Sequence, residues 1–178
     1  MSTLNILHFP DNKLRQKGKD IEVFDSKLSK IANDMLETMY LSKGIGLAAV
    51  QVGIAIRMIV IDVSETRNDP VILINPVITD KADEIIFEEG CLSVPGFYEK
   101  VERFNKIKYS YKDLHGKSKE SNADGLLAVC IQHEIDHLDG KLFVDYISEI
   151  KRDRISKKLQ KLGSEGNIPD RKKVPYSI

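Results

Sequence analysis

The segment Ile-Gln-His-Glu-Ile-Asp-His-Leu at residues 131–138 places two histidines four positions apart, with a glutamate directly after the first. On a helix, side chains four positions apart lie on one face, about 6 Å apart at Cβ, so His133 and His137 could bind one metal ion. Glu134 points about 100° away around the helix and could act as general base on a water molecule beside the metal. The motif therefore predicts a hydrolytic metal site, although paired histidines on a helix surface would show the same spacing.

A catalytic metal site of this kind needs a third protein ligand. Cys130 lies on the same helix face, but it is seven residues from His137, about 10 Å along the axis, and two short side chains cannot close that gap. We interpret Cys130 as a small apolar residue beside the site. Cys91 lies in a break rich in glycine and proline, where the backbone can approach another element, and it is better placed than His8 or His115.

A ligand imidazole is usually oriented by a hydrogen bond from its other nitrogen. Asp136, on the same helix, could supply this bond, or it could be a solvated carboxylate.

Three helices are expected to position these residues. Asp25 is expected to cap a helix that ends near Leu41, and Asp124 to cap a helix from about Gly125 to Leu138 that carries the histidines. A third helix is expected over 148–162. The residues that recur at helical spacing on the first and third helices are Leu28, Ile31, Met35, Met39, and Ile150, Ile155, Leu159, Leu162.

Runs of β-branched residues predict strands at 57–63 and 71–78, and polar–apolar alternation predicts a half-exposed strand at 106–113. The segment 84–97 begins like a strand and is expected to break at Gly90, Pro95 and Gly96. Residues 113–117 are typical of a hairpin turn. Because strands and helices do not alternate regularly, the pattern favours an α+β fold over a parallel α/β sheet.

The chain of 178 residues suits one domain, and its 27 basic and 27 acidic side chains indicate no partner by global charge. No signal peptide and no apolar run of about 20 residues is evident, so we expect a cytoplasmic protein without a membrane or DNA partner. In that compartment Cys91 and Cys130 are expected to stay reduced rather than form a disulfide.

Three segments taken together carry a specific resemblance: GIGLAAVQVG at 44–53, EGCLSVPG at 89–96 and QHEIDHLDG at 132–140. Their sequence, order and separation resemble the peptide deformylase family, over roughly residues 6–162. The resemblance implies antiparallel sheets around the helix that carries the motif, followed by a C-terminal helix. It also implies one catalytic domain over 1–162, and we expect 163–178 to be a polar, flexible tail.

The resemblance further implies the chemistry. Glu134 would act as acid and base, while the side chain of Gln51 and the backbone N–H of Leu92 would stabilise an oxyanion. The reaction would remove the formyl group from N-formylmethionyl nascent chains. The metal would be one divalent ion, ferrous iron in the physiological enzyme, with zinc or another ion possible. The metal ligands implied on matching positions are Cys91, His133 and His137.

Two alternatives remain open at this point. A zinc endopeptidase of the His-Glu-x-x-His type would share the helix motif, but no further histidine follows His137 as a third ligand. A metal-dependent binding module would not need Glu134 or Gln51, and both are present. Glu89 could support Gln51 or pair with Arg103, and the sequence does not choose between them.

Substrate contacts are expected in the glycine-rich segment. Gly44 and Gly46 could let an extended peptide pair with residues 44–47 as an added strand, or they could serve a tight turn alone. Core packing would equally explain the apolar residues that could form a pocket for the methionine side chain. These residues are Ile45, Leu126, Val129 and Cys130.

The C-terminal region is locally basic, with nine Lys/Arg against four Asp/Glu from Glu149 to Lys173. Its helix could contact ribosomal RNA phosphates, or it could be an ordinary solvated basic face. The basic residues concerned are Lys151, Arg152, Arg154, Lys157, Lys158 and Lys161.

Overall fold

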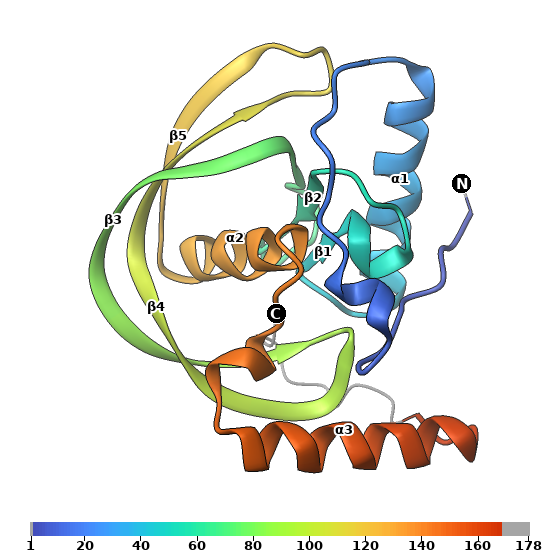
Figure 1. Ribbon diagram of the computed structural model, residues 1–178. Coiled ribbons are helices and arrows are strands. Elements are labelled where there is room, and N and C mark those ends of the chain that lie inside the picture. Colours follow the sequence, from blue (N-terminus) through green and yellow to red (C-terminus); the bar gives the residue numbers. More distant parts are fainter. Residues whose placement is uncertain (1, 169–178) are drawn as a thin grey trace.

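A five-stranded antiparallel sheet curves around a central helix in the computed structural model, which describes residues 2–168 (Figure 1). The α+β fold predicted from the sequence is confirmed. The strands follow chain order in the sheet: β1 (Gly46–Ala48), β2 (Met58–Ile61), β3 (Val71–Cys91), β4 (Val94–Lys112) and β5 (Ser118–Asp124). The helices are α1 (Ser26–Leu41), α2 (Gly125–Leu138), α3 (Glu149–Ser164) and three short 3-10 segments, η1 (Asn12–Arg15), η2 (Ala49–Val52) and η3 (Phe143–Tyr146).

Strands β3 and β4 form one long hairpin, and this corrects the predicted break at Gly90, Pro95 and Gly96. Gly90 lies inside β3, and Pro95 and Gly96 lie inside β4; the chain reverses instead at residues 92–93. Pro95 has no backbone N–H to donate to a neighbouring strand. It is tolerated in β4 because β5 pairs only with the far part of β4, from Lys106 to Lys112. The predicted strands at 71–78 and 84–97 are therefore pieces of this hairpin.

The last strand, β5, escaped prediction because its residues, SKESNAD, lack the apolar alternation on which strand prediction depends. The turn before it was predicted. Asp113 N donates to Lys117 O at 3.0 Å, and Gly116 N donates to Asp113 O at 2.9 Å. The turn pairs β5 with β4, and β5 then leads directly into α2.

Helices α1 and α2 have the predicted bounds, but their caps differ. The Asp25 carboxylate accepts hydrogen bonds from Lys27 N and Leu28 N, as expected. Asp124 stands at the N-cap of α2, yet its side chain makes no capping hydrogen bond. This correction has a structural reason: Asp124 is still paired with Lys106 as the last residue of β5, so the strand delivers the chain into the helix.

Helix α3 extends two residues past its predicted end at 162, and its buried stripe is narrower than predicted. Ile155 and Leu159 are each 4% exposed, but Ile150 is 75% exposed. Ile150 lies five positions before Ile155, which corresponds to about 140° around the helix, so the two isoleucines cannot share a face. Residues 169–178 of the predicted tail lie outside the described residues, and the single-domain assignment stays a prediction.

The central helix α2 contacts all five strands of the sheet and η2. Residues 128–135 are all buried, including Gln132, His133 and Glu134. Buried polar groups must find internal partners, so this helix has to place its polar side chains in specific contacts. Among residues 2–168, no helix combines the length and apolar character needed to cross a bilayer.

Candidate metal centre

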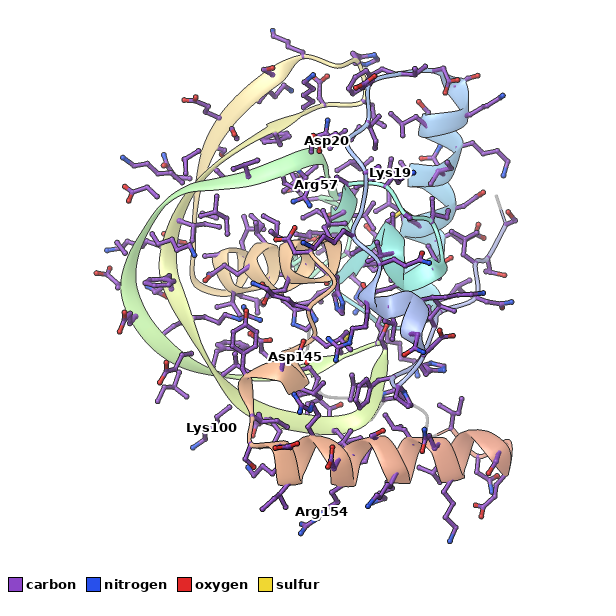
Figure 2. The ribbon with its side chains drawn as sticks, viewed as in Figure 1. Lys19, Asp20, Arg57, Lys100, Asp145 and Arg154 are labelled. Atoms are coloured by element: carbon purple, nitrogen blue, oxygen red, sulfur yellow. The ribbon has the colours of Figure 1, made fainter. Side chains whose placement is uncertain are left out.

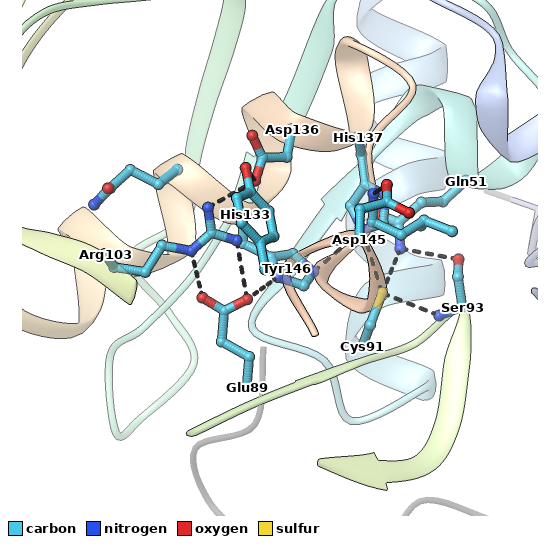
Figure 3. Close-up of polar contacts among 12 residues, drawn as sticks. Gln51, Glu89, Cys91, Ser93, Arg103, His133, Asp136, His137, Asp145 and Tyr146 are labelled. Atoms are coloured by element: carbon cyan, nitrogen blue, oxygen red, sulfur yellow. Dashed lines mark hydrogen bonds and ion pairs between the residues drawn. The ribbon is translucent and has the colours of Figure 1, made fainter. Parts of the chain in front are cut away.

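Three side chains converge at the tip of the β3–β4 hairpin (Figure 3). The ligand atoms of Cys91, His133 and His137 all lie within 4.8 Å of one another. Cys91 Sγ is 3.2 Å from His137 Nε2, which is 3.1 Å from His133 Nε2. The structure therefore brings together the three residues that the sequence predicted as ligands.

Local geometry explains the convergence. Cys91 is the last residue of β3, directly before the two-residue turn, and the histidines occupy consecutive turns of one face of α2. Cys130 points elsewhere: its Sγ lies 3.9 Å from Ile45 O, beside β1. Within residues 2–168, neither Cys91 nor Cys130 is part of a disulfide.

Glu89 orients the first histidine. Its Oε2 lies 2.8 Å from His133 Nδ1, and the carboxylate is fully buried. Arg103 donates to both of its oxygens, from Nε at 2.6 Å and from Nη2 at 3.0 Å. Because the carboxylate accepts the hydrogen bond from Nδ1–H, Nε2 is the ring nitrogen that His133 turns toward Cys91 and His137.

Asp136 was predicted as a candidate for this orienting role, and the prediction is wrong. Its carboxylate accepts instead from Arg103 Nη1 at 2.6 Å and from the Tyr146 hydroxyl at 2.8 Å. The question left open for Glu89 resolves in favour of Arg103. Arg103 and Glu89 thus lie between Asp136 and His133, which places Asp136 two contacts farther from the metal centre than expected.

The ionisation of these groups is strongly coupled. Burial opposes the charge on Glu89, but the contacts with His133 and Arg103 lower its pKa to about 2. Burial also opposes protonation of His133, yet Cys91 and Glu89 raise its pKa well above the usual value. Burial and the charge of His133 lower the pKa of His137. In the metal-free protein the site thus holds a proton on His133, which a metal ion must displace.

The residues present fit a divalent metal ion. Sulfur and two imidazole nitrogens supply three ligands and leave room for water or substrate, as in catalytic sites. A cysteine binds a metal ion as its thiolate, so Cys91 would supply a negatively charged ligand to a divalent ion. Burial and the charge of His133 lower the pKa of His137, and a neutral imidazole has one ring nitrogen with a lone pair for a metal ion.

Glu134 lies against the glycine-rich segment. A Cβ on Gly46 would collide with Glu134 Oε1 and lie 2.8 Å from Cys130 Sγ, while a Cβ on Gly44 would lie 2.7 Å from Leu92 Cδ1. Sequence analysis offered a peptide approach or a tight turn as reasons for these glycines. The structure adds another: they leave space for side chains of the site itself.

Gln51 is fixed at both ends of its amide. Its Oε1 accepts from Ala48 N at 2.7 Å, so its Nε2 must face the metal centre, 3.1 Å from Ser93 Oγ and 3.5 Å from Cys91 Sγ. Leu92 lies in the same turn as Ser93, with its side chain 8% exposed. The predicted oxyanion residues, Gln51 and Leu92, thus both lie next to the ligand cysteine.

Sequence analysis missed Ser93, Phe143 and Tyr146. Ser93 N contacts Cys91 Sγ at 3.4 Å, and its position two residues after the cysteine was a usable signal. Phe143 stacks on the His133 ring at 6.4 Å between centroids. Phe143 and Tyr146 belong to η3, where no spacing pattern connects them with the histidines.

The residues predicted for a methionine pocket have mixed surroundings. Ile45, Val129 and Cys130 belong to the buried core, and Leu126 packs against it. Packing alone explains their apolar character, so the pocket stays a prediction.

Comparisons with known proteins agree with this geometry. The model of the polypeptide deformylase family matches residues 3–153. The chain is 51% identical over 169 residues to the peptide deformylase of Alkalilimnicola ehrlichii, covering 94% of this chain and 95% of that one. It is 54% identical over 165 residues to that of Stutzerimonas stutzeri, covering 91% of this chain and 97% of that one.

Solved structures give the same result. The crystal structure of a peptide deformylase from Legionella pneumophila superposes with a TM-score of 0.88 at 44% identity, covering 93% of this chain and 98% of that chain. That of the Ehrlichia chaffeensis enzyme, in complex with actinonin, superposes with a TM-score of 0.87 at 40% identity, covering 90% and 98%. These matches do not favour the zinc endopeptidase alternative.

Proposed function

Because this chain belongs to the polypeptide deformylase family, we propose that it hydrolyses the formyl group from the N-terminal formylmethionine of nascent chains, releasing formate. The observation that carries the proposal is the convergence of Cys91, His133 and His137 beside the buried Glu134. Such substrates arise where proteins are synthesised, so the proposal implies a cytoplasmic enzyme.

The three ligands would hold one divalent metal ion, which when bound acidifies water and polarises a carbonyl oxygen. Ferrous iron is our proposal for the physiological ion. A thiolate with two imidazoles suits either iron or zinc, so metal availability in the cell decides which is bound.

Glu134 would take the proton from the attacking water and later deliver it to the leaving nitrogen. Its burial beside Gly46 favours proton transfer, because bulk water is kept away from the carboxylate. The Gln51 Nε2 group and the Leu92 N–H would donate to the oxyanion that forms as the formyl carbon becomes tetrahedral. The bond between Ala48 N and Gln51 Oε1 supports this role, because it holds the donor end of the amide toward the site.

The edge of the sheet would bind the peptide backbone. β1 pairs only with β2, and Asp62 N donates to Ile45 O at 2.8 Å. In an antiparallel ladder successive residues direct their polar groups to alternate sides, so those of Gly46 face the open edge. An extended substrate could pair there, with Ile45, Leu126 and Val129 near its methionine side chain.

The direct test is formate release from formyl-Met-Ala by protein purified without oxygen, with its bound metal measured. We expect formate from the wild type and none from metal-loaded Glu134→Ala, while acetyl-Met-Ala stays intact. Bound metal without formate, even after reconstitution with iron, would contradict the proposal.

A ribosomal partner is a second part of the proposal. On α3, Lys151 pairs with Glu99 at 2.7 Å and Lys158 lies over the Phe97 ring at 5.4 Å, so these two face the protein. Arg154 projects from the outer side of the helix (Figure 2), and Lys157 and Lys161 are also exposed. The outward cations are the candidates for contact with RNA phosphates.

Charge reversal at these positions tests the idea better than removing α3, whose Ile155 and Leu159 share a core cluster with Cys91. We expect the triple variant Arg154→Glu, Lys157→Glu, Lys161→Glu to lose ribosome binding at low salt and keep full activity on formyl-Met-Ala. Ribosome binding equal to that of the wild type would remove the helix from the interaction.

A further inference from the structure

Tyr146 contacts Arg103, which binds Glu89, and Asp136, which binds Arg103, although Tyr146 belongs to none of the three motifs. Its hydroxyl donates to Asp136 Oδ2 at 2.8 Å, and its ring lies 4.9 Å from the Arg103 guanidinium carbon (Figure 3). The side chain is half-exposed, at 47%. Such an arrangement is not needed to fill the core, so its contacts call for another explanation.

Arg103 is the central member of the group. It is 5% exposed and makes three charged hydrogen bonds: two to Glu89 and one, from Nη1 at 2.6 Å, to Asp136. A guanidinium is planar, so any rotation about its stem disturbs all three bonds together. The guanidinium carbon lies over the Tyr146 ring, and the Tyr146 hydroxyl donates to the same Asp136 oxygen that accepts from Arg103 Nη1.

Glu89 transmits this constraint to the metal centre, because the oxygen that accepts from Arg103 Nη2 also accepts from His133 Nδ1. The contacts thus run from Tyr146 through Asp136 and Arg103 to Glu89 and His133. The same short segment, η3, also places Phe143 against the His133 ring with an interplanar angle of 26°. η3 therefore contacts the face of this imidazole through Phe143. Through Tyr146 it also contacts the residues that hold Glu89 at Nδ1.

We propose that Tyr146 is a positioning residue for the metal centre: it holds Arg103 against Glu89, and so fixes the orientation of His133 as a ligand. Partners that orient a ligand histidine typically change metal affinity by about 10- to 100-fold when removed. Burial and the contact with Asp136 raise the pKa of Tyr146 to about 12, so its hydroxyl stays a donor at neutral pH. The inference rests on the proposed metal site but not on the reaction.

The test measures the rate at which zinc-loaded protein releases its metal to excess chelator. Tyr146→Leu removes both contacts and is expected to release zinc about tenfold faster than wild type. Tyr146→Phe keeps the ring over Arg103 and is expected to give an intermediate rate. Tyr111→Leu, a tyrosine at the far end of β4, is the matched control and should release zinc at the wild-type rate, with any loss of stability recorded by thermal unfolding.

A purely structural role would not depend on Glu89. In a Glu89→Gln background, which itself should release zinc faster, we expect Tyr146→Leu to add less than twofold. Release at the wild-type rate by Tyr146→Leu, or an undiminished effect in the Glu89→Gln background, overturns the proposal. If Tyr146→Leu does not fold, Tyr146→Phe tests the proposal in its place. Zinc release at the wild-type rate by Tyr146→Phe would then overturn the proposal. Zinc release is measured without substrate, so failure here leaves the proposed deformylation intact.

Discussion

At the scale of single residues, the amide of Gln51 illustrates how the backbone sets the chemistry of the site. The sequence could place Gln51 near the metal only through its resemblance to a family, because a glutamine in a glycine-rich segment has no spacing rule of its own. The structure supplies the physical reason: the Ala48 N–H selects which end of the amide turns toward Cys91.

We therefore expect Gln51→Ala to lower turnover by about 100-fold, the usual cost of one oxyanion donor. Metal content should stay unchanged, since Gln51 is not among the three ligands. Steady-state kinetics with formyl-Met-Ala, combined with metal analysis of the same sample, measures both. Turnover within threefold of the wild type would exclude Gln51 from the mechanism.

The coupled histidines predict how metal affinity depends on pH. Cys91 and Glu89 keep His133 protonated against the effect of burial, so metal binding must release this proton. Affinity should then weaken as the pH falls, by about tenfold per pH unit for each proton released. Zinc competition with a chelator at pH 6, 7 and 8, corrected for protonation of the chelator, gives the slope. A slope of zero would mean that the site is already deprotonated.

At the scale of elements, the three α-helices and the turn before β5 were predictable, while the long strands were predictable only in part. Helix α1 and the turn before β5 depend on local signals: the Asp25 cap, apolar residues at helical spacing, and Gly116 with a positive φ of 78°. Away from its tip the hairpin depends on pairing between residues distant in sequence, up to Ile74 with Lys112, which lets β3 run through the mostly polar residues 79–84. The sequence could favour Cys91 as a ligand. Its position at a hairpin tip could not be foreseen, because that position depends on the long-range pairing.

The close approach of β1 to α2 gives a prediction for Gly46. In Gly46→Ala the new Cβ must displace Glu134 or Cys130, and a shift of about 1 Å in a catalytic group can cost 100-fold in rate. We expect turnover to fall by at least tenfold. Gly163→Ala, in α3, is the control: its Cβ meets nothing within 4 Å, so it should keep full activity and gain about 0.5–1 kcal/mol of stability. Full activity in Gly46→Ala would show that the helix and strand can separate freely.

At the scale of the whole molecule, α3 belongs to the catalytic core rather than forming an appendage. Ile155 and Leu159 pack in one cluster with Phe143 and Cys91. The helix therefore supports the hairpin tip that carries Cys91, while its opposite face, with Arg154, Lys157 and Lys161, is exposed.

Two isoleucines of α3 test this arrangement directly. Ile155→Ala should lower the free energy of unfolding by about 2–5 kcal/mol, because it leaves a cavity in the cluster. Ile150→Ala makes the same change at a side chain that is 75% exposed, and it should change stability by less than about 0.5 kcal/mol. Denaturant titration of both variants measures the difference. Equal effects would mean that α3 does not pack as described.

The separation of the ligands along the chain sets an order of events in time. Cys91 and His137 are 46 residues apart, whereas the hairpin pairs nearest its tip, beginning with Cys91 and Val94, join residues close in sequence. Such local pairing forms quickly, whereas the histidines reach the cysteine only when α2 docks inside the curl of the sheet. During synthesis on the ribosome, Cys91 is made before α2, and it meets the histidines only after α2 has docked. Metal uptake should therefore follow the docking of α2, and the rate of uptake would report the rate of docking.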